Sequence, residues 1–480
     1  MSVLAAYLFN TLCNFAIGLL VAKFLGPAEY GRFALAFAVA IAVQVAFFDW
    51  LRLGATRFYS ERVRTEDPAL RATLDTAFVV ITFAMAISAC LLLLSGVRFT
   101  LSNGLIALSL VAAVSNGMFD YNTALVRARF HNRLYLRLII VKNALALFLT
   151  GGGAFFFGSA KMALVGSIIS LSGSIITARA SLHDDGTAPH HANLAIVKGI
   201  LRYSLPIVAA NLLYLAIPLA NRSIVAIVYG FSETGQFSLA YDIGSKAVQA
   251  IASTLDVVLF QIAVALHERD GPTKARAQVA NNMAIVIAIV LPTCTGIWLI
   301  LPSIEHVIVP VAYRGPFAHL LTLMMAGLFS QAIIQFGINP IFQIAKRTAP
   351  LVGAAVVACF VDVVLIYLLP KTSDASGLAI AQTGAYIGAL CVLIAIASLA
   401  KPQWPRPRDI VLAALGTGAM TVALLPLREH DPGLVTLAEQ VIAGTLIYGG
   451  FVAAFDVANM RAIMIDRLRP IMARLGLAPL

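Results

Sequence analysis

The sequence has few charged residues. Asp, Glu, Lys and Arg make up 12% of its 480 residues, whereas ordinary soluble proteins carry roughly 25%. So few charges cannot cover a water-facing surface, which excludes a soluble globular protein. Hydrophobic residues make up 60% of the chain and the mean hydropathy is +0.89, which is enough for many membrane spans of about 20 residues. We therefore predict an all-α, polytopic membrane protein.

Cysteine pairs and basic-aromatic runs are also missing. The five cysteines lie in apolar runs and no two of them form a CxxC pair, so we predict neither a metal site nor a disulfide framework. No cofactor is indicated. The net charge of +11 would raise the question of nucleic acid in a soluble protein, but basic residues do not alternate with aromatic ones here. We predict no nucleic-acid partner.

Long apolar runs fill the chain. Hydropathy predicts about fourteen spans separated by short loops, without a large extramembrane domain. The start lacks a basic leader and a small-residue cleavage site, so we expect the first run to be retained as a span. The predicted limits are 3–22, 33–56, 73–97, 103–126, 138–158, 162–179, 203–228, 236–265, 279–301, 318–344, 350–369, 376–400, 409–427 and 434–456.

The basic residues predict the orientation of the spans. Of the 34 Lys and Arg, 24 lie in the loops after even-numbered spans or in the tail, and 7 lie in the loops after odd-numbered spans. This bias puts both termini in the cytoplasm. Lys23 and Arg32 in the first hairpin run against it. The tail at 460–475 mixes Arg with Ile, Leu and Met, and we expect it to lie on the membrane surface as an amphipathic segment.

A short polar break between the first two spans recurs later in the chain. VAKFLGPAEYGRFALA (21–36) aligns with VAIVYGFSETGQFSLA (225–240) at a shift of 204, with eight identities in sixteen positions. We expect a tight hairpin in which Gly26 and Gly31 permit positive φ, Pro27 stops the helix and Glu29 accepts backbone N–H bonds at the next helix start. Six spans separate the copies, so both hairpins face one side, as in a parallel repeat.

Three stretches carry a family resemblance. LGPAEYGRFALA (25–36), NRSIVAIVYGFSETGQFSLAY (221–241) and SGLAIAQTGAYIG (376–388) resemble, in their joint spacing, the polysaccharide biosynthesis flippases of the multidrug/oligosaccharidyl-lipid/polysaccharide (MOP) superfamily. The resemblance extends in span order over nearly the whole chain. One departure is Asn221, where we expect an Asp before the Arg.

The resemblance implies both an architecture and a task. It implies two pseudo-symmetric six-helix lobes around a central cavity, residues 1–199 and 200–400, followed by two extra helices and a tail in 401–480. It implies flipping of undecaprenyl-diphosphate-linked oligosaccharide across the bacterial inner membrane for O-antigen, exopolysaccharide or capsule synthesis. The implied partners are that lipid-linked substrate, the membrane lipids, a polysaccharide polymerase and a chain-length regulator.

Polar residues inside the eighth and tenth spans are candidates for the cavity, because a charge at membrane depth is costly and usually faces a cavity or a partner. Asp242, Lys246 and Gln249 recur on one face of the eighth span, where Asp242 and Lys246 either line the cavity or form an i, i+4 ion pair. The tenth span carries amides at intervals of four that either bind sugar hydroxyls or join helices: Gln331, Gln335, Asn339 and Gln343.

Four further residues complete the predicted site. Asn14 lies on a polar face of the first span, and Asp362 is a lone carboxylate that either binds a coupling proton or sodium ion or packs helices. A diphosphate needs cations in place of its lost water, and the in-span cations Arg52, Arg222 and Lys246 are our candidates. Snorkelling at the cytoplasmic end is the competing interpretation for Arg52.

Two other function classes compete with the flippase. A cation-coupled multidrug exporter of the same superfamily is the alternative, but such exporters typically have twelve spans and need fewer cavity cations. An enzyme that polymerises or ligates glycans would usually carry a large outward loop with catalytic residues, whereas the outward loops here are short. We therefore predict a transporter that is not an enzyme.

Overall fold

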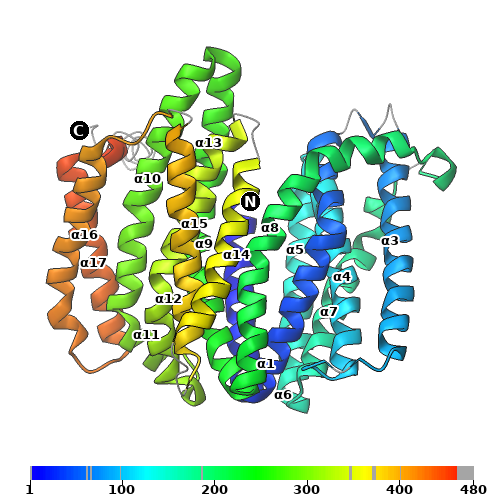
Figure 1. Cartoon of the computed structure of the whole chain (residues 1–480), viewed down its shortest axis with the longest axis horizontal. Coiled ribbons are helices and arrows are strands. Elements are labelled where there is room, and N and C mark those ends of the chain that lie inside the picture. Colours follow the sequence, from blue (N-terminus) through cyan, green and yellow to red (C-terminus); the bar gives the residue numbers. More distant parts are fainter. Residues whose placement is uncertain are drawn as a thin grey trace. The chain divides into compact units, whose positions relative to one another are not determined.

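Helices form all the regular structure in the part of the chain that the computed structural model describes, namely residues 3–60, 63–64, 68–97, 99–184, 187–344, 349–369, 374–399 and 402–461. The predicted amphipathic tail therefore lies almost entirely outside the described residues. The helices (Figure 1) are α1 (Val3–Phe58), α3 (Pro68–Leu94), α4 (Asn103–Ala128), α5 (Asn132–Ala146), α6 (Gly152–Phe157), α7 (Ala160–Leu182), α8 (Leu194–Val228), α9 (Phe231–Asp270), α10 (Pro272–Leu299), α11 (Leu301–Val307), α12 (Pro316–Ala332), α13 (Asn339–Ile344), α14 (Ala349–Leu368), α15 (Ser376–Leu399), α16 (Pro407–Arg428) and α17 (Leu434–Phe455).

Thirteen of the described helical segments are long and apolar enough to cross a membrane. The first of them, within α1, bends at Gly26, where φ of 69° and ψ of 171° leave the helical region, so α1 supplies two crossings. Two wider π-helical turns, η1 (Leu147–Gly151) and η4 (Ile333–Ile338), join shorter helices into single spans. The prediction of an all-α membrane protein with about fourteen spans is confirmed.

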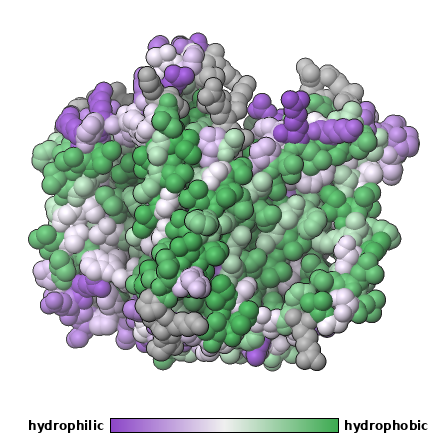
Figure 2. All heavy atoms as spheres, viewed as in Figure 1, coloured by the Kyte–Doolittle hydropathy of each residue, from purple (hydrophilic) through white to green (hydrophobic). Residues whose placement is uncertain are grey.

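The outer faces of the helices are apolar. In α3 the side chains of Val79, Phe83 and Leu91 are each more than 60% exposed, as expected for residues that face lipid. On the face shown in Figure 2, hydrophobic residues cover the middle of the helices and hydrophilic residues gather towards their ends. The chain is therefore a multi-pass membrane protein.

The described chain forms two compact units. One comprises Met1–Asp242 with Ala358–Gln382, and in it α1 packs against α4 and α8 while α4 packs against α7. The other comprises Ile243–Val357 with Thr383–Leu480, where α16 packs between α10 and α17. The lobes predicted from the repeat, 1–199 and 200–400, stay a prediction.

The repeated hairpin interlocks with its copy inside the first unit. Gly26 and Gly230, which are 204 residues apart, both have positive φ, at 69° and 87°. A Cβ on Gly31 would meet the backbone oxygen of Phe231, and a Cβ on Gly235 would meet that of Pro27, both well under 3.0 Å. These two contacts are reciprocal under the same shift of 204. Gly31 therefore serves close packing rather than the turn that we expected of it.

The glutamates of the two hairpins repeat this symmetry. Glu29 accepts a hydrogen bond from the backbone N–H of Ala160 at 2.9 Å, where α7 begins. Glu233, again 204 residues later, accepts one from the N–H of Ala375 at 3.3 Å, next to the start of α15. A carboxylate is favourable at a helix N-terminus, because the unpaired N–H groups there carry partial positive charge. Each glutamate therefore ties its hairpin to the last helix of its own six-span repeat.

Candidate functional site

The first unit brings five polar residues of four helices together at membrane depth. We call them the α8 polar cluster: Asn221 and Arg222 of α8, Asp242 of α9, Asp362 of α14 and Gln382 of α15. Asn221 is fully buried and donates from Nδ2 to Asp362 Oδ1 at 3.1 Å and to Gln382 Oε1 at 3.3 Å. Three predicted site residues, Arg222, Asp242 and Asp362, thus lie in one cluster.

Arg222 and Asp242 form the charged half of the cluster. The Arg222 side chain is 7% exposed and makes an ion pair with Asp242, while the guanidinium carbon lies 5.3 Å from the centre of the Tyr241 ring. Within the described residues, the buried Nε of Arg222 has no hydrogen-bond partner. The partner that the structure gives Asp242 is Arg222 of α8, which sequence reasoning did not name as its partner.

Asp362 and Asn221 form the other half. Asp362 is 2% exposed, and its Oδ1 accepts the hydrogen bond from the Asn221 amide. Asn221 Oδ1 is itself buried and has no partner among the described residues. One turn earlier, Pro218 interrupts the backbone bonding of α8, because proline has no N–H to give to the carbonyl of Tyr214. The local sequence thus loosens α8 beside its polar residues.

Arg52 lies in a separate contact of the first unit. It donates from Nη2 to Asp49 Oδ2 at 3.0 Å, and its side chain is 30% exposed. Eight residues earlier in α1, Gln44 donates to Asp120 Oδ2 of α4 at 3.0 Å. Arg52 is thus more accessible than Arg222, as its predicted place near the end of a span requires.

Sequence reasoning missed the cation Lys142. The count of loop charges includes it among the basic residues outside the spans, but it is buried within the span Asn132–Phe157. Its Nζ donates to Asn10 Oδ1 and Asn14 Oδ1, both at 2.9 Å, and Asn143 donates to Asn10 as well. Asn14, a predicted cavity residue, therefore contacts a cation. The signal available was the i, i+4 spacing of Asn10 and Asn14, which places two amides on one face.

The remaining predicted residues belong to the second unit. Lys246 is exposed, and Gln249 is half-buried and donates to Ser245 at 2.9 Å. Gln331 and Asn339 are half-buried, and Gln335 between them is exposed. Gln335 lies in the π-helical turn η4. Residues four apart rotate slowly around an α-helix, because an α turn holds 3.6 residues. The wider π turn holds more residues and offsets that rotation. The three amides therefore keep to a similar face.

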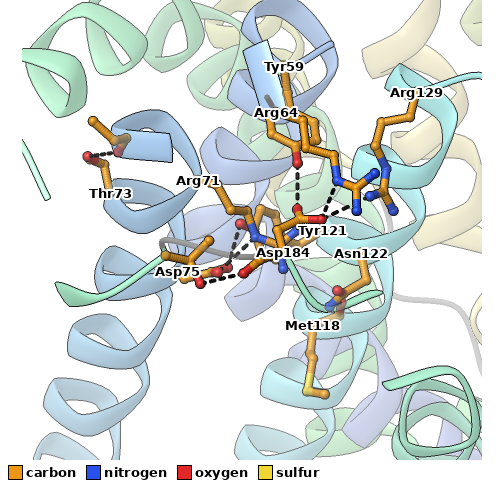
Figure 3. Close-up of polar contacts among 12 residues, drawn as sticks. Tyr59, Arg64, Arg71, Thr73, Asp75, Met118, Tyr121, Asn122, Arg129 and Asp184 are labelled. Carbon is orange, nitrogen blue, oxygen red and sulfur yellow. Dashed lines mark hydrogen bonds and ion pairs between the residues drawn. The ribbon is translucent and has the colours of Figure 1, made fainter. Parts of the chain in front are cut away.

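A second polar network of the first unit gathers around a carboxylate just outside a span, and some of its members lie inside other spans. Asp184, which follows α7, is almost fully buried and accepts hydrogen bonds from Tyr59 and from three arginines (Figure 3). These are Arg64 at 2.6 Å, Arg129 at 3.1 Å and Arg71 at 3.4 Å. Burial acts to raise the pKa of Asp184, but the hydrogen bonds from Tyr59 and Arg64 and the nearby Arg71 and Arg129 hold it below its ordinary value.

This network fastens the segment that follows α7 to α3 and to the segments that directly follow α1 and α4. Arg71 also donates to Asp75 at 2.8 Å, and Tyr121 of α4 donates to the other Asp75 oxygen at 2.7 Å. We call these residues the Asp184 clamp: Tyr59, Arg64, Arg71, Asp75, Tyr121, Arg129 and Asp184. Sequence reasoning did not find it, because Asp184 lies more than one hundred residues from Arg64 and Arg71. It lies outside the predicted substrate site.

No metal site accompanies these clusters in the part of the chain that the structure describes. Within it, no group of three or more His, Cys, Asp or Glu side chains is arranged to hold a metal ion, and all five cysteines are free. The charged groups at membrane depth instead contact amides and each other.

Comparison with known proteins gives one family and several structures. The sequence model of a family described as "Polysaccharide biosynthesis protein" matches residues 19–313. No curated protein matches the chain. Among solved structures, "Lipid II flippase MurJ, inward closed conformation" is similar with a TM-score of 0.70 and 15% identity, over 94% of this chain and 98% of that one.

Two multidrug transporters are similar over less of the chain. An inward-facing multidrug resistance MATE family transporter of the MOP superfamily has a TM-score of 0.61 and 15% identity, over 84% of this chain and 96% of its own. A point mutant of the Vibrio cholerae MATE transporter VcmN has a TM-score of 0.55 and 14% identity, over 82% of this chain and 95% of its own. At such identities the likeness concerns the fold.

Proposed function

The chain belongs to the polysaccharide biosynthesis protein family, and from that premise we propose that it flips a lipid-linked oligosaccharide across the membrane. The substrate of this proposal is an undecaprenyl-diphosphate-linked oligosaccharide in the bacterial inner membrane, and both chain termini lie in the cytoplasm. The fold that it has in common with a lipid II flippase and with MATE transporters supports transport rather than chemical conversion. A polymerase and a chain-length regulator would act on the delivered product.

The observation that carries this proposal is the Arg222–Asp242 ion pair within the spans, in which the Arg222 side chain is 7% exposed and the Asp242 side chain is 26% exposed. Burying two charges costs several kcal/mol per ion before their attraction offsets it, so such a pair is weak evidence for stability alone. A diphosphate offers acceptor oxygens that suit the guanidinium bidentately. In the proposed cycle the diphosphate takes Arg222 from Asp242, and the pair forms again when the substrate leaves.

Arg52 and Lys246 supply the other positive charges in the proposal. Lys246 is exposed and Arg52 is half-buried, so both remain accessible while Arg222 is paired. In this scheme each of them donates charge-assisted hydrogen bonds to the diphosphate. The amides Gln249, Gln331, Gln335 and Asn339 are proposed to bind sugar hydroxyls, because an amide both donates and accepts.

Asp362 is the proposed coupling residue. A carboxylate at membrane depth is costly unless a cation, a proton or hydrogen-bond donors neutralise it. Its donor is the neutral amide of Asn221 at 3.1 Å, which leaves its charge to be balanced by a proton or a sodium ion. Because Asn221 and Arg222 are adjacent in α8, occupancy at Asp362 would reach the Arg222–Asp242 pair through one helix turn.

Flipping by purified protein in liposomes tests the proposal. We would follow the transfer of a fluorescent undecaprenyl-diphosphate sugar to the outer leaflet for the wild type, Arg222→Met with Asp242→Leu, and the charge swap Arg222→Asp with Asp242→Arg. The first double variant replaces the ion pair by apolar residues, which is often neutral for stability where a pair is shielded from water. We expect both to fold and both to lose at least about 90% of the flipping rate, which corresponds to roughly 1.4 kcal/mol of barrier.

A matched control keeps loss of fold apart from loss of transport. Lys198→Gln changes an exposed basic residue of α8 that lies outside the cluster, and it should flip at the wild-type rate. Full flipping by the Arg222→Met, Asp242→Leu variant would contradict the proposal. Failure of the wild-type protein to flip any lipid diphosphate, with export of a cationic dye instead, would favour the multidrug exporter.

A further inference from the structure

A cavity of about 470 Å³ opens in the second unit, and none of its lining residues belongs to the proposed transport site. The start of α10, the segment 402–406, the start of α16 and the turn η5 (Val457–Asn459) surround it. Pro272 begins α10 and Pro407 begins α16, so two long helices present their N-termini at this end of the unit. Helix N-termini favour anions. The side chains that line the cavity give stronger evidence for an anion site than the helix N-termini do.

Two cations line the cavity without a strong partner. Lys274 of α10 is 68% exposed, and its Nζ lies 3.5 Å from Asp270 Oδ2. Arg406 is exposed, and nothing in the described part of the chain pairs with its guanidinium. Gln278 and Asn281 follow Lys274 at i+4 and i+7, so one face of α10 offers an ammonium group and two amides to the same space.

The lining carboxylate is already engaged. Asp409 is 7% exposed and accepts the backbone N–H of Ala458 at 3.2 Å, which fixes η5 against α16. That bond uses part of its capacity as an acceptor and keeps the cavity wall in place. Among the described lining residues, two basic groups therefore face one occupied acid. The balance favours an anion that also accepts hydrogen bonds.

The lining also contains apolar residues, and apolar side chains are exposed close by in the sequence, on α16. Ala277 and Ala284 of α10 line the cavity beside its polar groups. On α16, shortly after Arg406, the side chains of Ile410 and Val411 are 40% and 56% exposed, as residues in contact with acyl chains would be. Trp404 lines the cavity as well, and tryptophan is enriched where membrane and water meet. The basic, water-accessible part of the cavity thus lies next to an apolar surface.

We propose that this cavity binds the phosphate headgroup of an anionic phospholipid, with the acyl chains along α16. Lys274 and Arg406 contact the phosphate oxygens, the α10 amides contact the headgroup hydroxyls, and Trp404 lies at the level of the glycerol. Basic pockets between membrane helices are suited to such headgroups. The chain's own tail is a poor occupant, because it brings Arg467, Arg469 and Arg474 to an already basic cavity.

Native mass spectrometry of the purified full-length chain tests this site. The protein in detergent is titrated with phosphatidylglycerol, with phosphatidylcholine as the zwitterionic lipid, and separately with glycerol 1-phosphate and inorganic phosphate as soluble sources. We expect retention of phosphatidylglycerol over phosphatidylcholine. Replacing both cations, as Lys274→Gln with Arg406→Gln, should weaken that retention about thirtyfold, since each basic group near an anionic headgroup contributes roughly five- to sixfold.

Two variants with matched charge changes complete the experiment. Arg269→Gln with Arg276→Gln removes two exposed cations from the same end of the same unit without touching the lining, and should retain lipid as the wild type does. Lys274→Arg with Arg406→Lys keeps both charges and should retain binding. Equal loss in the Arg269, Arg276 variant, equal retention of both lipids, or binding of soluble phosphate without phosphatidylglycerol would each overturn the proposal.

Discussion

The chain builds its first hairpin twice, with nearly the same backbone and very different chemistry around it. Gly26 and Gly230 make the same turn, and Glu29 and Glu233 bind the same kind of helix start. At the same shift of 204, however, the polar residues Arg222, Asp242 and Lys246 of the second copy replace Gly18, Ala38 and Ala42 of the first. The repeat thus preserves the residues that fix backbone geometry, while each copy carries its own polar groups.

The ends of the two six-span repeats differ in the same way. After α7, which ends the first, Asp184 is a buried acid held by three arginines. After α15, which ends the second, the chain reaches Arg406, a base without a partner among the described residues. At the end of the first repeat the acid is neutralised by basic residues of the chain itself. At the end of the second repeat the base is available to a ligand. We infer that fastening and binding are divided between the segments that follow the two repeats.

The largest expected change in stability comes from disrupting the symmetric contact between the two hairpins. A methyl group on Gly31 or Gly235 would meet the backbone of the other hairpin, which cannot move as a flexible side chain can. We expect Gly31→Ala and Gly235→Ala each to cost about 3 kcal/mol or more of unfolding free energy, at the upper end for overpacked sites. Because the contacts are reciprocal, the two losses should be equal within error. The measurement is thermal unfolding in detergent.

Gly418→Ala is the matched control for this pair. Gly418 lies within α16 with nothing within 4 Å of a Cβ, so alanine there should stabilise by about 1 kcal/mol through helix propensity alone. If Gly31→Ala and Gly235→Ala behaved like Gly418→Ala, the interlocked hairpins would not be a packing constraint. A large loss in one and none in the other would show that the repeat is not symmetric in energy.

A smaller effect should separate the two glutamates. Glu29→Gln and Glu233→Gln keep the shape of the side chain but remove the charge at a helix N-terminus, which is worth about 0.3–1 kcal/mol. Glu29 also pairs with Arg32, and its bond to Ala160 is shorter than that of Glu233 to Ala375, 2.9 Å against 3.3 Å. We therefore expect a larger loss of thermal stability in Glu29→Gln. The reverse order would mean that the second hairpin is the better anchored.

These contrasts explain what the sequence could and could not predict. The spans and the turn at Gly26 follow from local patterns, because hydropathy and a Gly-Pro pair act over a few residues. The partner of Asp242 does not follow from local patterns, because Arg222 lies 20 residues earlier in the chain, on the neighbouring helix. Asn221 likewise meets Asp362 from 141 residues away. Lys142 was missed because the predicted span starts at 138, which places Lys142 close to the end of the span. The helix in fact begins at Asn132, so Lys142 lies further inside it.

The smallest effect is expected from acid acting on the Asp184 clamp. The clamp holds the pKa of Asp184 below its ordinary value of about 3.9, although burial opposes this. A carboxyl group with a lowered pKa stabilises the fold fully above its ordinary pKa and loses that contribution only as the pH falls through the lowered one. The stability difference between the wild type and Asp184→Asn should therefore be constant from about pH 8 to about pH 5.

Below about pH 4 that difference should shrink, because protonated Asp184 no longer attracts Arg64, Arg71 and Arg129 as strongly, and the Tyr59 hydroxyl donates to a weaker acceptor. Thermal unfolding of both proteins across this range is the measurement. If the stabilities of the two proteins already converged at about pH 6, well above the ordinary carboxyl pKa, the three arginines would not act on Asp184 as their distances indicate. The end of the first repeat would then be no more firmly fastened than the end of the second.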